Sequence, residues 1–204
     1  MPFNSWTENV IVADADYVDS VAFNLIVNFE RMLERRVRKA DTALWLECVA
    51  IDGGMAIADD KAAAEAVQAV LVHDSTSTAM QNFEPGNFNA DLDGKAFVSR
   101  VGECTMTAVQ TEPMVDKQKL IVDMLDVVCQ QEEVRRLMVV VPEAMTDAVR
   151  RIMQRYDSDR RRTTLITMQP ATGGAFRHVS LGFSLMAALG ISSKEIDEKL
   201  AAGR

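Results

Sequence analysis

The sequence is poor in the residues that build common metal and disulfide sites. Its 204 residues include three cysteines and two histidines, and no CxxC pair occurs. An odd number of widely spaced cysteines does not indicate a disulfide framework. We therefore expect Cys48, Cys104 and Cys129 to be core thiols in a reducing compartment. Because His73 and His178 are the only histidines in the sequence, a zinc site with several histidine ligands is excluded.

Membrane-spanning and targeting segments are also missing from the sequence. No run of about 18 apolar residues occurs, so no transmembrane helix is predicted. The first residues, MPFNSWTENV, have neither the basic segment nor the apolar core of a signal peptide, and we expect a cytoplasmic protein. The net charge of −8 and the pI near 4.8 argue against broad binding to nucleic acid or to anionic membranes, because both are polyanions.

The composition and the apolar pattern are those of a globular protein with alternating strands and helices. Hydrophobic residues make up 48% of the chain and charged residues 25%, which is enough for a sizeable core. Residues 9–14 predict a strand buried on both faces, because Val10 to Ala13 are apolar without alternation. An amphipathic helix follows to about residue 33, and we expect Asp19 or Ser20 to cap it.

The pattern continues to the end of the chain and predicts a single domain over residues 1–204. The further expected strands cover residues 43–51, 68–72, 95–101, 103–110, 137–141 and 163–168. The further expected helices cover residues 58–67, 115–131, a segment starting at Pro142, 179–189 and 193–201. Residues 95–110 alternate between polar and apolar, which predicts an antiparallel hairpin inserted into the sheet or added at its edge. The fold class is therefore a three-layer α/β/α sandwich with a mainly parallel, Rossmann-like sheet.

Acidic residues follow three successive predicted strands. Asp14 and Asp16 end the first strand, Asp52 ends the second, and Asp74 ends the third. In open parallel sheets, ligands bind outside the carboxyl ends of the strands. Four carboxylates at that edge could bind Mg²⁺ or Mn²⁺, which favour oxygen ligands. The same residues could instead cap helices and hydrogen-bond tight turns, and both interpretations stay open.

Two known kinds of site share part of this pattern. The apolar strand followed by Asp14-x-Asp16 resembles the first motif of haloacid-dehalogenase-type phosphatases. A first-strand aspartate with acids on later strands resembles PIN- and NYN-type nucleases. Both resemblances are short. Tyr17-Val18 replaces the turn that follows the second aspartate in the phosphatases, and the late strand ends in Val141-Pro142-Glu143 without a second acidic motif.

A glycine-containing loop near the end of the chain is a candidate anion site. Gly173 and Gly174 precede a predicted helix and could present N–H groups to an anion, with Arg177 as the charged partner. The loop lacks the Lys-Ser/Thr of a P-loop and the GxGxxG of a dinucleotide site, so a plain turn is the alternative. The basic run at residues 160–162 follows two aspartates, and we expect it to be a solvated loop.

Over its full length, the chain resembles an uncharacterised family of Bacteroidetes proteins. The segments that carry the resemblance are ADADYVDSVAFNLIVNFERML, ECVAIDGG and MQPATGGAFRH. The resemblance implies a bacterial cytoplasmic α/β protein and assigns no catalytic residue.

Two hypotheses about function follow from these observations. Because the sequence has neither a recognisable nucleophile motif nor a late acidic motif, it favours a non-catalytic binding or assembly protein, and we expect a homo-oligomer. Its twelve methionines suit adaptable apolar surfaces. The alternative is a divalent-metal-dependent hydrolase, similar to phosphodiesterases or nucleases. In that case Asp14 and Asp16 would bind the ion, supported by Asp52 and Asp74.

Overall fold

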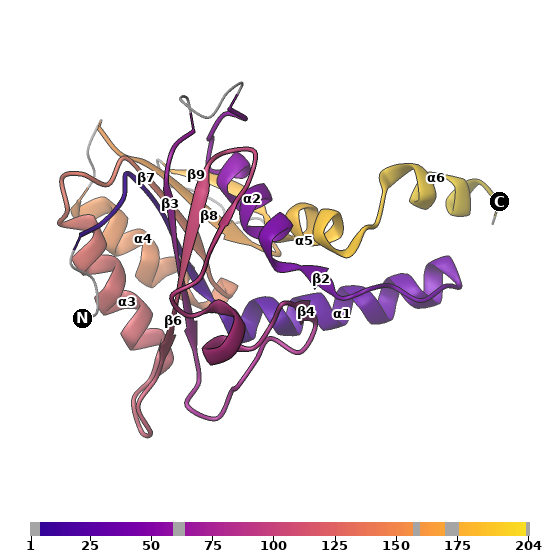
Figure 1. The fold of residues 1–204 in the computed structure, drawn as a ribbon, viewed down its shortest axis with the longest axis horizontal. Coiled ribbons are helices and arrows are strands. Elements are labelled where there is room, and N and C mark those ends of the chain that lie inside the picture. Colours follow the sequence, from indigo (N-terminus) through magenta and orange to yellow (C-terminus); the bar gives the residue numbers. More distant parts are fainter. Residues whose placement is uncertain (1–4, 59–63, 157–159, 170–175, 203–204) are drawn as a thin grey trace.

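The structure, a computed structural model, describes residues 5–58, 64–156, 160–169 and 176–202. Within these residues, seven strands form one sheet in the order β5-β6-β3-β1-β7-β8-β9 (Figure 1). All neighbouring pairs are parallel except β5 with β6. The strands of this sheet are β1 (Asn9–Asp14), β3 (Val67–His73), β5 (Ala96–Val98), β6 (Glu103–Gln110), β7 (Arg136–Val140), β8 (Arg162–Thr167) and β9 (Arg177–Ser180).

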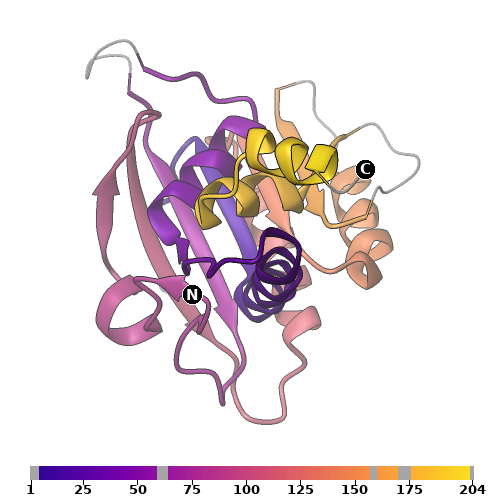
Figure 2. The ribbon, with the colours of Figure 1, turned by 90° about the vertical axis from the view of Figure 1, so that its right-hand side faces the viewer.

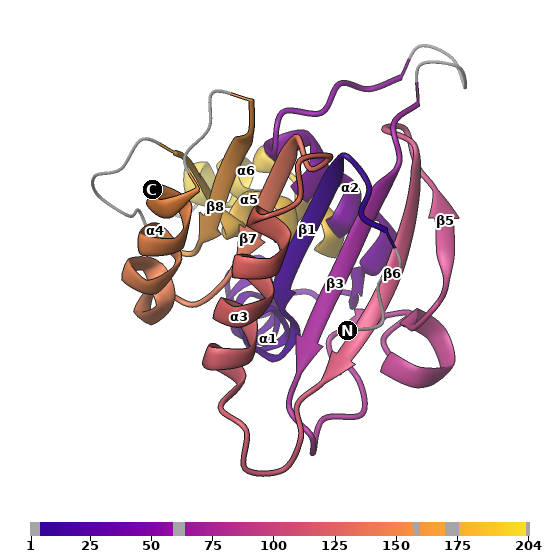
Figure 3. The same cartoon turned by 90° about the vertical axis from the view of Figure 1, so that its left-hand side faces the viewer.

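Helices cover both faces of the sheet, which confirms the predicted three-layer sandwich (Figures 2 and 3). One face carries α1 (Ala15–Leu33), α2 (Thr42–Asp52) and α5 (Leu181–Leu189), and α6 (Ser193–Ala202) packs against α1. The other face carries α3 (Lys117–Cys129) and α4 (Thr146–Arg155). The smaller elements are β2 (Ala40–Asp41), β4 (Phe83–Glu84), η1 (Phe88–Leu92) and η2 (Glu143–Met145).

The order of the six parallel strands is that of a Rossmann sheet. Counted along the chain, β1, β3 and β6 are the first three parallel strands, and they run outward from the centre. The next three, β7, β8 and β9, run outward on the other side. The resulting order 3-2-1-4-5-6 is the doubly wound arrangement. The Rossmann-like sheet is confirmed, and β5 is an antiparallel addition at one edge.

The central strand β1 explains why its sequence shows no alternation. All six of its residues are buried. Ile11 and Ala13 belong to the core beneath α1, α2 and α5, whereas Val10 and Val12 belong to the core beneath α3 and α4. A strand covered on both faces requires apolar residues at every position.

The first helix begins earlier than predicted. It starts at Ala15, and the carboxylate of Asp14 accepts the N–H of Tyr17 at 3.0 Å. The expectation that Asp19 or Ser20 would cap the helix was therefore wrong. Asp19 instead accepts the backbone N–H of Asn82 at 2.8 Å. The strand passes into the helix without a loop, because Asp14 both ends β1 and caps α1.

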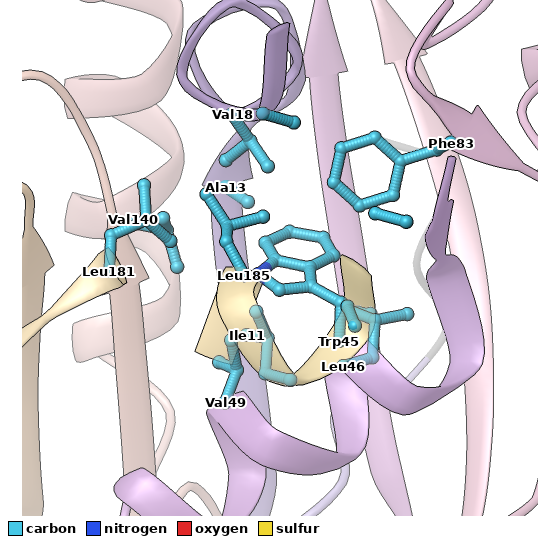
Figure 4. Close-up of a cluster of buried hydrophobic side chains, with 14 of the residues drawn as sticks. Ile11, Ala13, Val18, Trp45, Leu46, Val49, Phe83, Val140, Leu181 and Leu185 are labelled. Atoms are coloured by element: carbon cyan, nitrogen blue, oxygen red, sulfur yellow. The ribbon is translucent and has the colours of Figure 1, made fainter. Parts of the chain in front are cut away.

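Residues 43–51, which were predicted to be a strand, form helix α2. The carboxylate of Asp41 caps the helix by accepting the N–H of Leu44 at 2.9 Å. Trp45 and Val49 are fully buried, and α2 packs against both α5 and β1. Figure 4 shows Trp45 beside Phe83 within this core. A short helix that is apolar on several sides lacks a polar stripe, so its sequence resembles that of a buried strand.

Two further expectations need correction. Of the predicted helix at residues 58–67, residues 59–63 lie outside the described residues, residues 58 and 64–66 are irregular, and Val67 begins β3. The predicted hairpin exists as the antiparallel pair β5–β6, but β6 also pairs in parallel with β3. Residues 103–110 are therefore an integral strand of the sheet, and β5 alone is the addition.

Candidate functional sites

Three of the four aspartates predicted to bind a metal meet at the carboxyl edge of the sheet, around a lysine. The Nζ atom of Lys117 lies 2.9 Å from Asp14 Oδ1, 2.7 Å from Asp16 Oδ2 and 3.0 Å from Asp74 Oδ2. Asp14 ends β1, Asp16 lies in the first turn of α1, Asp74 follows β3, and Lys117 is the first residue of α3. The lysine ammonium group therefore occupies the point on which the three carboxylates converge. We call these four residues the Lys117 cluster.

Burial and charge act against each other within the Lys117 cluster. Burial alone would lower the pKa of Lys117, but hydrogen bonds to Asp16 and Asp14 outweigh it, so the pKa is raised and the ammonium group stays charged. Burial raises the pKa of Asp14 despite its bond to Lys117. Burial would also raise the pKa of Asp16, but hydrogen bonds from Lys117, from the Ser77 hydroxyl and from the Asp74 N–H lower it.

The cluster fits the interpretation of Asp14 and Asp16 as a helix cap and a turn anchor. Asp14 caps α1, and Asp16 accepts hydrogen bonds from the backbone of Asp74 and from Ser77, which holds the turn after β3. In the described part of the chain, no group of three or more histidine, cysteine, aspartate or glutamate side chains is arranged to hold a metal ion. The Mg²⁺ or Mn²⁺ site stays a prediction, and it would require Lys117 to move.

Asp52 does not join the other three aspartates. It is the last residue of α2, and the next two residues, Gly53 and Gly54, approach Met138 of β7 and Arg162 at the start of β8. Asp52 therefore lies at the amino edge of the sheet, and its placement with the strand-end acids was wrong because α2 is not a strand. Burial raises the pKa of Asp52, and the charge of Arg177 partly offsets this effect.

Tyr17 and Glu143 lie at the carboxyl ends of β1 and β7, where a Rossmann sheet normally receives its ligand. The hydroxyl of Tyr17 donates to Glu143 Oε1 at 3.3 Å and accepts the N–H of Met168 at 3.2 Å. Glu143 Oε1 also accepts the N–H of Gln169 at 2.9 Å. Because β1 runs directly into α1, the glycine-rich turn that binds a pyrophosphate is missing here. The topology of a dinucleotide-binding sheet is therefore present without its phosphate-binding loop.

The ionisation of the Tyr17 phenol tests whether its hydroxyl is buried beside Glu143. Burial, with Glu143 adding to it, raises the pKa of Tyr17 from 10.0 to about 12. An ultraviolet titration of the wild type should show a tyrosinate transition near pH 12 that is missing in Tyr17→Phe. Because the folded-state pKa is raised, the linked stabilisation is complete below pH 10 and is lost as the pH rises through about 12. Tyr156→Phe is the control and should keep the transition; if Tyr17→Phe also keeps it, the assignment is wrong.

A second feature, a cavity of about 950 Å³, lies at the amino edge of β7, β8 and β9. Among the described residues, its carboxylates are those of Glu8 and Glu65, whereas six arginines line it. These arginines are Arg135, Arg136, Arg160, Arg161, Arg162 and Arg177. The predicted anion site contributes Arg177 to this lining, while Gly173 and Gly174 lie outside the described residues. That anion site stays a prediction, but its charged member belongs to a larger arginine-lined cavity.

Three of the arginines start three neighbouring strands. Arg136 and Arg162 are register partners at the starts of β7 and β8, whereas Arg177, which starts β9, is in register with Thr164 of β8. Register partners in a sheet face the same side, where like charges repel. Glu65 lies 2.7 Å from Arg136, and the charge of Asp52 acts on Arg177. We call these three residues the arginine row.

Arg161 has a different role in the same cavity. Its guanidinium group donates to the backbone carbonyls of Cys129, Gln131 and Val134, at 2.8, 2.6 and 3.0 Å. These carbonyls lie at and just after the end of α3, where unpaired acceptors and the negative end of the helix dipole favour a cation. Arg161 is therefore a structural residue that fixes this wall of the cavity.

The comparison with protein families agrees with this picture of a fold without a recognised site. A model of a family of unknown function matches residues 4–196. The chain belongs to that family, DUF6621. No curated protein and no solved structure matches the chain. Membership of DUF6621 confirms the resemblance to an uncharacterised family, and it assigns no activity. Among the described residues, no helix has the length and apolar character needed to cross a membrane.

Sequence reasoning missed Lys117 and the grouping of the arginines. Lys117 is the first residue of α3, where the positive end of the helix dipole disfavours a cation. That unfavourable position is a signal that the lysine has acidic partners elsewhere in the fold. The basic run at residues 160–162 was interpreted as a solvated loop, but these three arginines line the cavity.

Proposed function

We propose that the protein is a non-catalytic binding protein that takes a small, multiply charged anion into the arginine-lined cavity. The observation that carries this proposal is that six arginine residues line one cavity in a chain of net charge −8. Guanidinium groups bind phosphate and carboxylate through paired N–H donors. Among the described residues, Glu8 and Glu65 supply the carboxylates of the lining, and a bound anion would relieve the repulsion between the like charges of the arginine row.

The size of the cavity favours a compact ligand. A volume of about 950 Å³ lies within the range of small-molecule sites. An extended polyanion such as nucleic acid would have to run beyond the cavity over a protein whose overall charge is negative, and this charge repels it. A small anion meets only the local positive charge.

The chemistry of the lining favours binding over catalysis. Cys129 lines the cavity and has a side chain that can act as a nucleophile. Burial raises the pKa of its thiol, so the reactive thiolate is disfavoured. The carboxylate of Glu65 is held in an ion pair with Arg136, at 2.7 Å. We further propose a cytoplasmic homo-oligomer. Free cysteines support the location, and the exposed Phe23 and Val27, one turn apart on α1, support the assembly.

The second candidate function is a divalent-metal-dependent hydrolase at the Lys117 cluster. The convergence of Asp14, Asp16 and Asp74 at the carboxyl edge favours it, because hydrolases of this kind hold metal ions with carboxylates. The position of Lys117 opposes it. A metal ion would have to displace an ammonium group that three charge-assisted hydrogen bonds hold in place.

Calorimetric titration with inorganic tripolyphosphate tests the proposed binding function. We expect binding that weakens as the salt concentration rises, and an affinity loss of about tenfold or more in Arg162→Gln, since a hydrogen bond to a charged group contributes about 1.5–3 kcal/mol. Arg31→Gln, at an exposed arginine of α1, is the matched control and should bind like the wild type. Absence of binding by the wild type, or equal losses in both variants, would contradict the proposal.

A further inference from the structure

We infer that the anion bound in this cavity is a nucleoside phosphate, whose phosphates meet the arginine row and whose base packs on an aromatic wall. This inference rests on the proposed function and adds the class of its ligand. The same cavity is also lined by apolar and aromatic side chains: Met153 and Tyr156 at the end of α4, and Phe176 just before β9. We call these three side chains the aromatic wall. A ligand that binds both the arginine row and the aromatic wall must carry phosphate and a flat ring.

The aromatic wall is held in place by its own contacts. Tyr156 and Phe176 are half-buried and pack against the core beneath α3 and α4. The guanidinium carbon of Arg150 lies 5.8 Å from the centre of the Phe176 ring. The hydroxyl of Tyr156 accepts a hydrogen bond from Gln130 at 3.2 Å. Because both rings are anchored and still line the cavity, a base can stack on them with little loss of side-chain freedom.

Neutral polar groups lie among the charged and aromatic residues. Gln154 and Thr163 both line the cavity, and each offers a donor and an acceptor. The edge of a nucleobase also carries donors and acceptors, which a ligand made of phosphate alone does not use. The guanidinium group of Arg161 donates to three backbone carbonyls. Arg161 therefore fixes the shape of the cavity and is not counted among the groups that bind the ligand.

The location of this cavity distinguishes it from the nucleotide site of ordinary Rossmann sheets. That site lies at the carboxyl ends of the strands, at the switch between β1 and its neighbour. Here Tyr17 and Glu143 are hydrogen-bonded to each other at that switch, and the Lys117 cluster surrounds the start of α1. The arginine-lined cavity lies at the amino ends of β7, β8 and β9, where the strand starts supply the charge. The fold therefore presents its anion site at the opposite edge.

Calorimetric titrations with ATP, GTP and inorganic tripolyphosphate distinguish the contribution of the arginine row to the affinity from that of the aromatic wall. We expect the nucleoside triphosphates to bind at least about tenfold more tightly than tripolyphosphate, since stacking on an aromatic ring contributes that much. Phe176→Leu and Tyr156→Leu should each reduce this preference and leave the affinity for tripolyphosphate unchanged. Arg162→Gln should weaken both kinds of ligand. Phe183→Leu, at an exposed aromatic residue of α5, is the control and should change neither.

The outcomes separate this inference from the proposed function. If tripolyphosphate binds and the nucleoside triphosphates bind no more tightly, the nucleoside inference is overturned and the anion-binding function stands. If no phosphate compound binds, both are overturned. If single-stranded RNA binds more tightly than any nucleoside triphosphate, the ligand is an extended polyanion and the inference is again wrong. Thermal melting of each variant identifies any that do not fold, and because Phe176 and Tyr156 test the same wall, one folded variant suffices.

Discussion

Replacing Lys117 with methionine should destabilise the protein by about 3 kcal/mol, because the change leaves partly buried carboxylates without their counterion. Asp14 and Asp16 have side chains that are 5% and 24% exposed, so water replaces little of the lost interaction. Asp74 is half exposed and contributes less, which places the expected loss at the low end of the range for broken buried ion pairs. Urea unfolding followed by circular dichroism measures the change in free energy.

The matched control lies two residues further along the same helix. Lys119 is exposed, and Lys119→Met should change the free energy of unfolding by no more than about 0.5 kcal/mol. Equal losses in Lys117→Met and Lys119→Met would show that the acidic cluster contributes nothing specific.

A second substitution shows whether the loss is electrostatic. Asparagine caps helices as well as aspartate does, so Asp14→Asn keeps the bond to the Tyr17 N–H and removes one charge. In the Lys117→Met background this change should recover part of the lost stability, whereas alone it should not stabilise the protein. Strictly additive effects would contradict the view that Lys117 acts by balancing carboxylate charge.

The single variant Lys117→Met also helps to choose between the anion-binding function and the metal-dependent hydrolase. With Lys117 replaced, Asp14, Asp16 and Asp74 lack a cation, and Mn²⁺ or Mg²⁺ should raise the melting temperature of the variant by binding to the folded state. If the metal stabilises the wild type equally well, the hydrolase alternative gains over the anion-binding function.

The acidic part of the Lys117 cluster could be predicted from the sequence, but the lysine could not. Asp14 and Asp74 follow strands that are parallel, and the carboxyl ends of parallel strands meet at one edge. Lys117 is 101 residues away from Asp16, on a helix of the opposite face. Its proximity depends on the spatial order of β6, β3 and β1, which short-range periodicity does not encode.

The position of Asp52 and the arginine-lined cavity also could not be predicted from the sequence. Asp52 was placed at the carboxyl edge because α2 has an apolar run without a polar stripe, and such a run suits a buried strand equally well. The arginine row is formed by Arg136, Arg162 and Arg177, which become neighbours only because β7, β8 and β9 are adjacent in the sheet. In the sequence, Arg162 lies in a basic run that was interpreted as a solvated loop, Arg177 was predicted to bind an anion with Gly173 and Gly174, and nothing connected either of them with Arg136.

Replacing Trp45 should produce a second large effect, and its size should depend on the replacement. Trp45 is fully buried in α2, and its ring meets that of Phe83 edge-on at a centroid distance of 5.5 Å. Trp45→Ala removes most of this packing and should cost about 3–5 kcal/mol of the free energy of unfolding. Urea unfolding followed by far-ultraviolet circular dichroism measures the loss.

Trp45→Phe should cost much less than the loss of volume alone suggests. Within the described residues, the indole Nε1–H of Trp45 is buried and has no hydrogen-bond partner. A buried donor without a partner costs about 1–3 kcal/mol, and phenylalanine removes this penalty while keeping the aromatic contact with Phe83. We therefore expect Trp45→Phe to lie within about 1.5 kcal/mol of the wild type. If both replacements cost the same, the indole N–H must contribute to stability, and the position of Trp45 in this core would need revision.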